Sequence, residues 1–375
     1  AMLWVPDRTR ADALEARVQA LLPHTVRPVR TPAAFAYLLV STWRTVRADP
    51  LGPLELVTGA QEDQLIASLL TRDDIGWPGG LTPQMRALPA FRMEVRNLFA
   101  RAGEAGISGT SLSERGRRHS RPEWVAAGEL LGDYEDGPDF AVTARGTMSV
   151  DTSRIQRIAA DVLRRWEADA PVAGVSAPPP LPGVVVVDDL QDCTASTVEL
   201  LAVMAERGVR VVALSDPDVA VASYRGGEPH LDQRLAARLG SEVIELGDVH
   251  RGTPALRALV RDVTSRVTTA GSLHRRRVGV APGSAADPTD EGGTDTGAAD
   301  LHIHLTASQA QLGALIAHGL RAHHLHEGIP WERMVVLVRS QGGVEEVRHQ
   351  LRRGGVPVTG RRRAIAFASE PVTRT

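Results

Sequence analysis

Two aspartates follow directly after a run of four valines, in the segment 184–192 that reads VVVVDDLQD. A continuous β-branched run of this kind predicts a strand that is buried on both faces of a parallel sheet. The end of such a strand is where α/β sheets bind ligands. There, Asp188 could hold Mg²⁺ through an oxygen or a water, and Asp189 could orient or deprotonate the water that attacks a nucleotide phosphate. The alternative is a structural turn in which Asp192 or Thr194 caps the next helix.

A second polar segment, residues 211–227, comes one predicted helix later and places Asp216 after the next strand. It also sets Tyr224 beside Arg225, an aromatic face next to a guanidinium, which is a pairing that single-strand tracks use. A response-regulator receiver domain also has paired acids after its first strand, but that class needs a lysine. All 43 basic residues of this chain are arginine, and the spacing to Asp216 is short for a receiver, so we set that class aside.

Together the two segments resemble motifs II and III of the UvrD/Rep-like superfamily-one DNA helicases, whose patterns run V-D-E-F-Q-D and G-D-P-D-Q-S-I-Y-x-F-R-G-A. Shorter matches extend the resemblance over about residues 3–360. Residues 249–252 stand where the family has N-Y-R-S, residues 30–35 where T-F-H-S touches DNA, and residues 334–340 where a strand opens the second RecA-like core. The helical stretch 59–145 is similar to the actinobacterial AdnAB-type helicase–nuclease subunits.

The resemblance implies ATP and Mg²⁺ as cofactors and gives each matched residue a role. It implies catalytic roles for Asp188, Asp189 and Gln191, with Asp188 also as the metal ligand. It implies ATP phosphate contacts for Arg251 and Asp216. It implies DNA contacts for Tyr224, Arg225, Thr31, Phe35 and Arg339. The expected partner is therefore DNA, as a single strand or a duplex end, with a second helicase–nuclease subunit as a further candidate, in DNA repair or recombination.

Several positions depart from the family patterns. Asp189 stands in place of a glutamate, and a carboxylate drawn back by about one ångström can lower a rate about a hundredfold. Val219 replaces the glutamine that senses the γ-phosphate, and the P-loop lysine is missing, because the chain starts just after the place where it is expected. We therefore expect no ATP hydrolysis by this chain alone. Two hypotheses stay open: part of an ATP-dependent DNA helicase, or a non-catalytic DNA-binding or partner-binding subunit with a vestigial motor fold.

The elements that must position these residues alternate between strand and helix, which predicts an α/β fold with a RecA-like parallel sheet. The first core is expected from residues 1–50 and 150–280, with a helical insertion at 51–149, a linker at 281–300 and the start of a second core at 301–375. The predicted strands after the N-terminal one are residues 183–187, 209–214, 242–246, 301–305 and 334–338.

Composition limits the remaining functions. A single cysteine excludes an internal disulfide and a multi-cysteine zinc site, and it favours a reducing, cytoplasmic compartment. No apolar run approaches the roughly 18 residues of a membrane span, so no membrane partner is expected.

The net charge is −2, but arginines cluster at 115–121, 275–277 and 361–363, and such clusters either bind phosphates or lie solvated at helix ends. Histidines 302–326 form a weak metal-binding candidate.

Overall fold

The computed structural model is of mixed α/β type, mostly helical, with a small parallel sheet. It describes residues 1–46, 54–57, 59–72, 74–136, 148–169, 181–222, 227–228, 230–244, 246, 254–266, 302–339 and 341–358. The chain divides into two compact units, residues 1–248 with 262–279 and residues 249–261 with 280–375. None of the described helices is both long enough and apolar enough to cross a membrane.

A four-stranded parallel sheet in the order β2-β1-β5-β6 lies at the centre of the first unit. Its strands are β1 (Met2–Trp4), β2 (Val29–Arg30), β5 (Val184–Val187) and β6 (Arg210–Ala213). β5 pairs with β1 on one side and with β6 on the other, and its valines alternate between fully and partly buried. The predicted strands at 183–187 and 209–214 are therefore confirmed.

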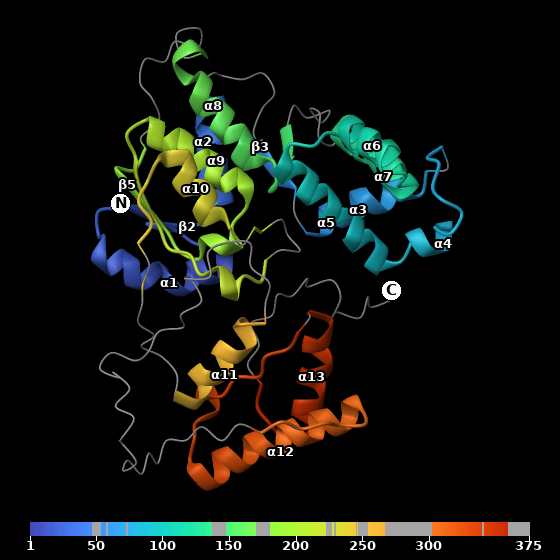
Figure 1. Cartoon of the computed structure of the whole chain (residues 1–375), viewed down its shortest axis with the longest axis vertical. Coiled ribbons are helices and arrows are strands. Elements are labelled where there is room, and N and C mark those ends of the chain that lie inside the picture. The colour runs from blue at the N-terminus through green and yellow to red at the C-terminus, as the bar shows by residue number, and fades with distance from the viewer. Residues whose placement is uncertain are drawn as a thin grey trace, which may run out of the picture. The chain divides into compact units, whose positions relative to one another are not determined.

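The chain leaves the two inner strands in opposite directions. β1 leads through α1 (Arg8–Leu21) to β2, whereas β5 leads through α9 (Ala195–Glu206) to β6 on the other side of the sheet. Because crossovers between parallel strands are right-handed, α1 and α9 cover opposite faces, as Figure 1 shows. The strand order thus reverses between β1 and β5, and open α/β sheets bind ligands beyond the carboxyl ends of the strands at such a point.

One face of the sheet carries a layer of helices with a continuous apolar core. α2 (Pro32–Val46) packs on α8 (Ile155–Asp169), which packs on α9, and α10 (Leu231–Leu239) adds to the same layer. The rings of Trp43 and Trp166 lie 4.4 Å apart between α2 and α8. The ring of Trp4, on β1, lies 5.2 Å from that of Phe35 on α2, so aromatic contacts join the helices to one another and to the sheet.

The predicted strand at 242–246 is wrong for the residues that the structure describes there. Residues 242–244 and 246 have no strand, and the side chains of Ile244 and Leu246 are exposed. A short apolar run has strand-like composition, but a strand forms only by hydrogen bonding to a neighbour, and this run does not pair with β6. β6 is therefore an edge strand of the described sheet.

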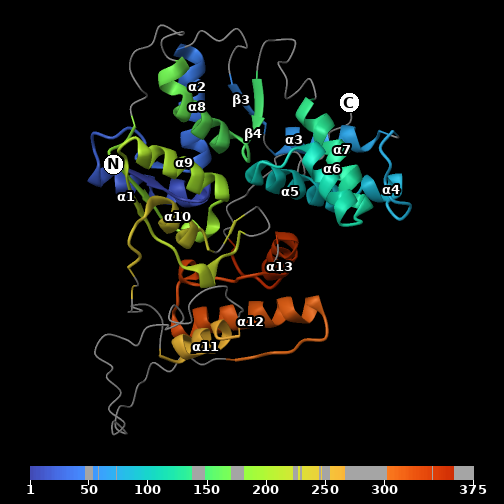
Figure 2. The ribbon, with the colours of Figure 1, turned by 45° about the horizontal axis from the view of Figure 1, so that its top comes forward.

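The helical lobe of the first unit, whose ribbon is seen in Figure 2, contains a second apolar core. The lobe consists of α3 (Ala60–Leu70), α4 (Pro83–Arg86), α5 (Pro89–Ala105), α6 (Gly109–Arg118) and α7 (Pro122–Asp136). A parallel strand pair, β3 (Leu54–Val57) with β4 (Met148–Asp151), joins the two ends of this segment of the chain. The sequence predicted the helical character of the lobe but neither α6 nor the strand pair.

α6 and α7 form a closely packed helical hairpin because glycines face one another across it. A Cβ on Gly128 of α7 would lie 2.5 Å from the backbone nitrogen of Ser113 and 2.7 Å from the carbonyl oxygen of Gly109, both on α6. A Cβ on Gly132, one turn further along α7, would meet nothing within 4 Å. The hydroxyl of Ser113 also donates a hydrogen bond to the carbonyl oxygen of Val125 at 3.1 Å.

The second unit has helices but no strand among its described residues. It contains α12 (Gln309–Glu327) and α13 (Gln341–Arg353), which pack together around Ala317, Leu351 and Val356. The predicted strands at 301–305 and 334–338 are wrong for described residues 302–305 and 334–338. Leu305 is 97% exposed and Leu337 is 88% exposed. Among the described residues these runs pair with no neighbouring strand, although Val336 packs against the cluster of Ala317, Leu351 and Val356. α11 (Pro254–Thr264) completes the described helices.

The two glycines of α7 give a matched test of the hairpin. Gly128→Ala should lower the free energy of unfolding by about 1–3 kcal/mol, because its methyl group would force the two backbones apart. Gly132→Ala should raise it by up to about 1 kcal/mol, because alanine is the better helix former and has room there. Chemical denaturation followed by circular dichroism measures both values. Equal effects from the two substitutions would contradict the close packing.

Candidate functional site

The acidic segment after β5 lies at the point where the strand order reverses. The backbone N–H of Asp188 donates to the carbonyl oxygen of Trp4, at the end of β1, at 2.9 Å. The next N–H, of Asp189, donates to the carboxylate of Asp188 at 3.1 Å. Asp189 itself has φ 52° and ψ 48°, the left-handed conformation, which aspartate tolerates better than most residues. The chain therefore turns sharply at the carboxyl edge of the sheet.

Gln191 connects the end of β5 to the end of β6. It lies in a short 3₁₀ turn, Leu190–Asp192, and its side chain is only 1% exposed. Its amide nitrogen donates to Asp189 Oδ1 at 3.1 Å, and its amide oxygen accepts the backbone N–H of Asp216 at 2.9 Å. Both halves of the amide are therefore used, and the segments that resemble motifs II and III are joined by one side chain.

Arg10, on the first turns of α1, supplies the positive charge of this edge. Its Nη1 lies 3.2 Å from Asp189 Oδ2, and both Nη1 and Nη2 lie 3.1 Å from Asp192 Oδ2. The Asp192 side chain is 3% exposed, and its Oδ1 accepts the backbone N–H of Val221 at 2.9 Å. A buried carboxylate needs a partner of opposite charge together with hydrogen bonds, and Asp192 has both.

The sequence did not single out Arg10, because its acidic partners lie far along the chain. Local signals near it were present: Asp7 is the N-cap of α1, and its carboxylate accepts the N–H of Arg10 at 3.0 Å. Only the sheet topology brings α1 next to the turn after β5. The edge therefore consists of Asp188, Asp189, Gln191 and Asp192 together with Arg10.

The alternative of a structural turn is borne out in part, because Thr194 is the N-cap of α9. Its N–H lies 3.5 Å from the Thr197 hydroxyl, which donates to Gln156 of α8 at 2.7 Å. Cys193, immediately before the cap, is buried, and burial raises the pKa of its thiol to about 12, with Asp192 and Asp189 adding to the rise. A buried thiol with a raised pKa has little thiolate at neutral pH, which is the form that reacts.

Glu104, near the end of α5, joins the helical lobe to the N-terminus of α9. Its carboxylate accepts a hydrogen bond from the Ser196 hydroxyl, on the first turn of that helix. Burial raises the pKa of Glu104 to about 7, although the hydrogen bonds from Ser196 and Thr194 lower it. The lobe and the acidic edge of the sheet are thus linked by a carboxyl group that titrates near neutral pH.

The fit of this edge to Mg²⁺ rests on Asp188 alone. Mg²⁺ at nucleotide sites is usually held by one or two carboxylates together with waters and phosphates. Asp188 is half-buried and accepts one backbone N–H, which leaves oxygen lone pairs for an ion. Asp189 is already engaged by Arg10 and Gln191. The described part of the chain contains no group of three or more histidine, cysteine or acidic side chains placed to hold a metal, and this includes the described histidines of residues 302–326.

The residues predicted to contact DNA or the ATP phosphates are placed in different ways. Phe35 is 4% exposed and packs on Trp4, so its ring belongs to the core, a burial that the motif match did not indicate. Thr31 precedes α2, and its hydroxyl accepts the N–H of Ala34 at 3.1 Å. Arg339 is exposed in the second unit, and Asp216 is exposed beyond β6. The remaining predicted contacts lie outside the described residues: Tyr224, Arg225 and Arg251.

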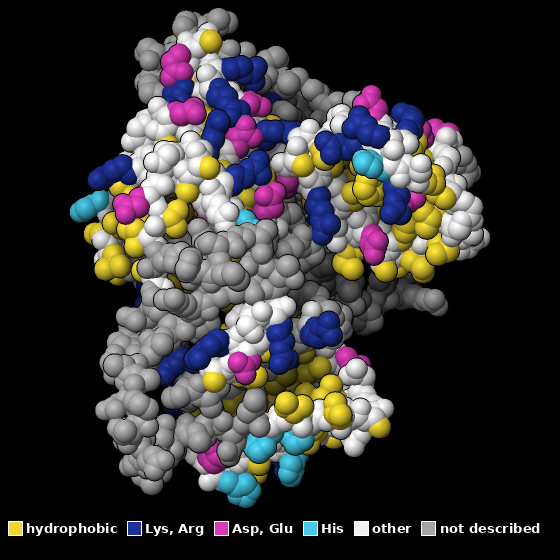
Figure 3. Space-filling view, viewed as in Figure 1, with side chains coloured by type: hydrophobic (Ala, Val, Ile, Leu, Met, Phe, Trp, Pro, Cys, Tyr) yellow, Lys and Arg dark blue, Asp and Glu magenta, His cyan; other side chains and the backbone are white. Residues whose placement is uncertain are grey.

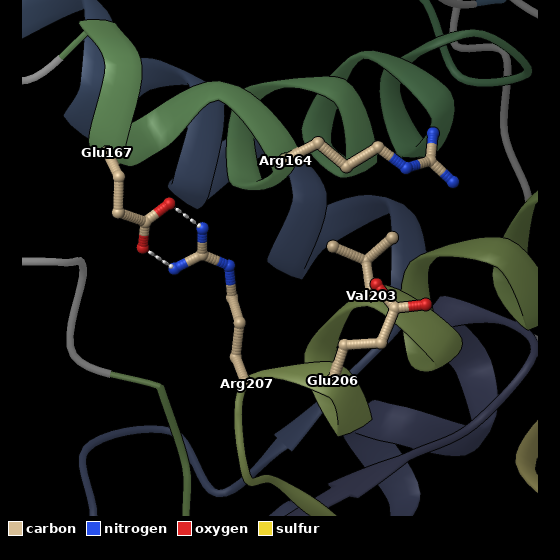
Figure 4. Close-up of a pocket in the computed structure, with 5 residues that line it drawn as sticks. All are labelled: Arg164, Glu167, Val203, Glu206 and Arg207. Atoms are coloured by element: carbon tan, nitrogen blue, oxygen red, sulfur yellow. Dashed lines mark hydrogen bonds and ion pairs between the residues drawn. The ribbon is translucent and has the colours of Figure 1, made fainter.

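A surface groove between α8 and α9 is not this site. Figure 4 shows its lining side chains, and its volume is about 590 Å³. Arg207 pairs with Glu167 across it at 2.5 Å, and Arg164 pairs with Glu199 at 2.6 Å. Because its charges already neutralise one another, the groove has the character of an ion-pair network on the surface.

Comparison with known proteins does not assign the chain to a family. No family model matches it, and no curated protein sequence matches it significantly.

Two arginines of α1 offer a matched test of the edge. Arg10→Ala should lower the free energy of unfolding by about 2 kcal/mol, because it leaves the Asp192 carboxylate buried without its partner. We expect less than the roughly 3 kcal/mol of a fully buried pair, because Arg10 is partly exposed. Arg8→Ala should change it by less than about 0.5 kcal/mol, because Arg8 and its partner Asp12 are both exposed. Urea denaturation measures both, and a silent Arg10→Ala would show that the pair contributes nothing.

Glu104 predicts a pH dependence of stability. Its pKa is raised in the folded state, so folding binds a proton, and the stabilisation is complete below about pH 4.5 and lost as the pH rises through about 7. In Glu104→Gln, up to about 3 kcal/mol of this pH-dependent fall in the free energy of unfolding should disappear. Glu94→Gln, at an exposed carboxyl group of the same helix, is the control. Stability curves for Glu104→Gln and wild type that stay parallel from pH 4.5 to 8 would rule the effect out.

Proposed function

We propose that the chain is a DNA-binding module of the UvrD/Rep-like helicase type whose acidic sheet edge is structural and does not hydrolyse ATP by itself. The observation that carries the proposal is the contact of Gln191 with both Asp189 and Asp216. It brings together the two segments that resemble motifs II and III, at the reversal point where open α/β sheets bind ligands. Two sequence matches that are separate along the chain thus coincide in space, which supports the resemblance and a RecA-like first core.

Arg10 favours the non-catalytic hypothesis over a working motor. Its guanidinium contacts Asp189, the residue that would act on the attacking water, and Asp192 on the same turn. A carboxylate whose oxygens are already held by a guanidinium and an amide is not free to orient a water. Val219, in place of the γ-phosphate sensor, is an exposed valine without a polar group. The chain contains no lysine for the phosphates of a nucleotide.

A motor role in a larger assembly is the second candidate, and Asp188 favours it. This carboxylate is the one least engaged at the edge, and it would hold Mg²⁺ if ATP bound there. In this proposal Arg251 contacts the γ-phosphate, and Tyr224 with Arg225 contacts DNA, together with Thr31 and Arg339. Phe35 has no place among these contacts because it is buried. A second helicase–nuclease subunit would be the partner in DNA repair.

The test is phosphate release from Mg²⁺-ATP with and without single-stranded DNA. The 375-residue chain should release no phosphate above background, because its second acid is paired and a phosphate-binding lysine is absent. In the same chain, Asp188→Ala should leave this background unchanged, with Asp218→Ala as a control on the neighbouring turn. A DNA-stimulated rate above background that falls about a hundredfold in Asp188→Ala alone would replace the structural edge with the motor candidate.

A further inference from the structure

The tip of the α6–α7 hairpin carries a surface that the proposed sheet-edge site does not use. We call it the hairpin-tip surface and define it by the side chains that surround the turn between the two helices: Arg115, Arg117, Arg118, His119, Arg121 and Trp124. Its arginines and its histidine are exposed, and the Trp124 side chain is partly exposed. In Figure 3 dark blue side chains gather around a cyan histidine over the part of the lobe where Figure 1 labels α6 and α7.

The positive charges of the hairpin-tip surface are largely unpaired. Among the described residues, Arg115, Arg117 and Arg118 form no ion pair, and Arg121 lies 3.7 Å from Glu123, an exposed and weak contact. Arginines in the last turn of a helix gain from its dipole. Three arginines within one turn also repel one another. An anion that binds there is attracted by all three and reduces the repulsion between them.

An aromatic face lies within the same surface. Trp124, on the first turn of α7, is 39% exposed, and its ring lies 6.5 Å from that of His119 in an edge-to-face arrangement. The exposed indole thus belongs to a surface that also carries exposed arginines. It matches a ligand that presents negative charge and a flat π-face together, and single-stranded nucleic acid presents both in every nucleotide.

The turn that carries these groups is fixed by its own packing. The N–H of Arg121 donates to the carbonyl oxygen of Gly116 at 2.8 Å, and Ser120 takes a left-handed φ of 53°. A Cβ on Gly116 would lie 2.7 Å from the backbone nitrogen of Val125, so the two helices stay close up to the tip. A surface already held in place loses little conformational entropy when a ligand binds.

We propose that the hairpin-tip surface binds single-stranded DNA, with Arg115, Arg117 and Arg118 on successive phosphates and Trp124 stacked on a base. The choice of DNA over RNA rests on the proposed function, whereas the surface and its chemistry do not. The site is separate from the sheet edge, since neither Arg10 nor the residues after β5 take part.

The test is fluorescence anisotropy of a labelled oligo-dT of about 20 nucleotides, titrated with the 375-residue chain over a salt series. Arg117→Glu/Arg118→Glu should weaken binding at least about tenfold and reduce the salt slope by about 2, because each arginine neutralises one phosphate. Arg352→Glu/Arg353→Glu, two exposed arginines in the last turn of α13, is the matched control and should leave affinity unchanged. Trp124→Ala should weaken single-strand binding about 5- to 100-fold and duplex binding far less.

The outcomes separate the alternatives. Unchanged binding in the Arg117/Arg118 variant, or an equal loss in the α13 control, would overturn the site. A Trp124→Ala variant that binds oligo-dT like the wild type would also overturn it, because the surface would then bind any polyanion. Heparin that displaces labelled oligo-dT as well as unlabelled oligo-dT does would lead to the same conclusion. Tighter binding of oligo-U than oligo-dT would overturn the choice of DNA. If Arg117→Glu/Arg118→Glu weakens oligo-dT binding and Asp188→Ala leaves the affinity for oligo-dT unchanged, the hairpin-tip site is supported. This holds for both hypotheses about ATP.

Discussion

The contact of Arg10 with Asp192 is the constraint on which the carboxyl edge of the sheet depends. The Asp192 side chain is 3% exposed, so its charge must be matched inside the protein, and Arg10 with the N–H of Val221 supplies the match. These groups come from the chain after β1, after β5 and after β6. One buried carboxylate therefore ties three neighbouring strand ends together, and the turn that carries Asp188 and Asp189 is fixed as a consequence.

This constraint bears directly on function. A guanidinium that neutralises Asp189 and Asp192 replaces the positive charge that a metal or a lysine would bring to such an edge. In the proposed function, the pairing that stabilises the fold also keeps Asp189 from acting on an attacking water. The helical lobe keeps its connection to this edge through Glu104 and Ser196, and it presents its unpaired arginines at the turn between α6 and α7. Paired charges lie at the sheet edge, and unpaired positive charges lie at the hairpin tip.

The sequence predicted most of what local pattern can specify. The valine run predicted β5, and the alternation of strand and helix predicted a parallel sheet. α6 was missed because Gly109, Ser113 and Gly116 are weak helix formers, held in a helix by close packing on α7. The strands predicted at 242–246, 301–305 and 334–338 were not found in the described residues, because pairing is not a local property. Arg10 was missed because only topology joins it to Asp189, and burial removed Phe35 from the DNA contacts.

Hydrogen–deuterium exchange at two backbone amides tests the central claim most directly. The N–H of Val221 donates to Asp192 and the N–H of Asp216 donates to Gln191, so both report on the acidic edge. If the edge is a closed structural cluster, both amides should exchange slowly, and adding Mg²⁺-ATP should leave their rates unchanged. Rapid exchange of either amide in the free protein, or a change in its rate on adding Mg²⁺-ATP, would contradict a structural edge and point instead to a nucleotide site.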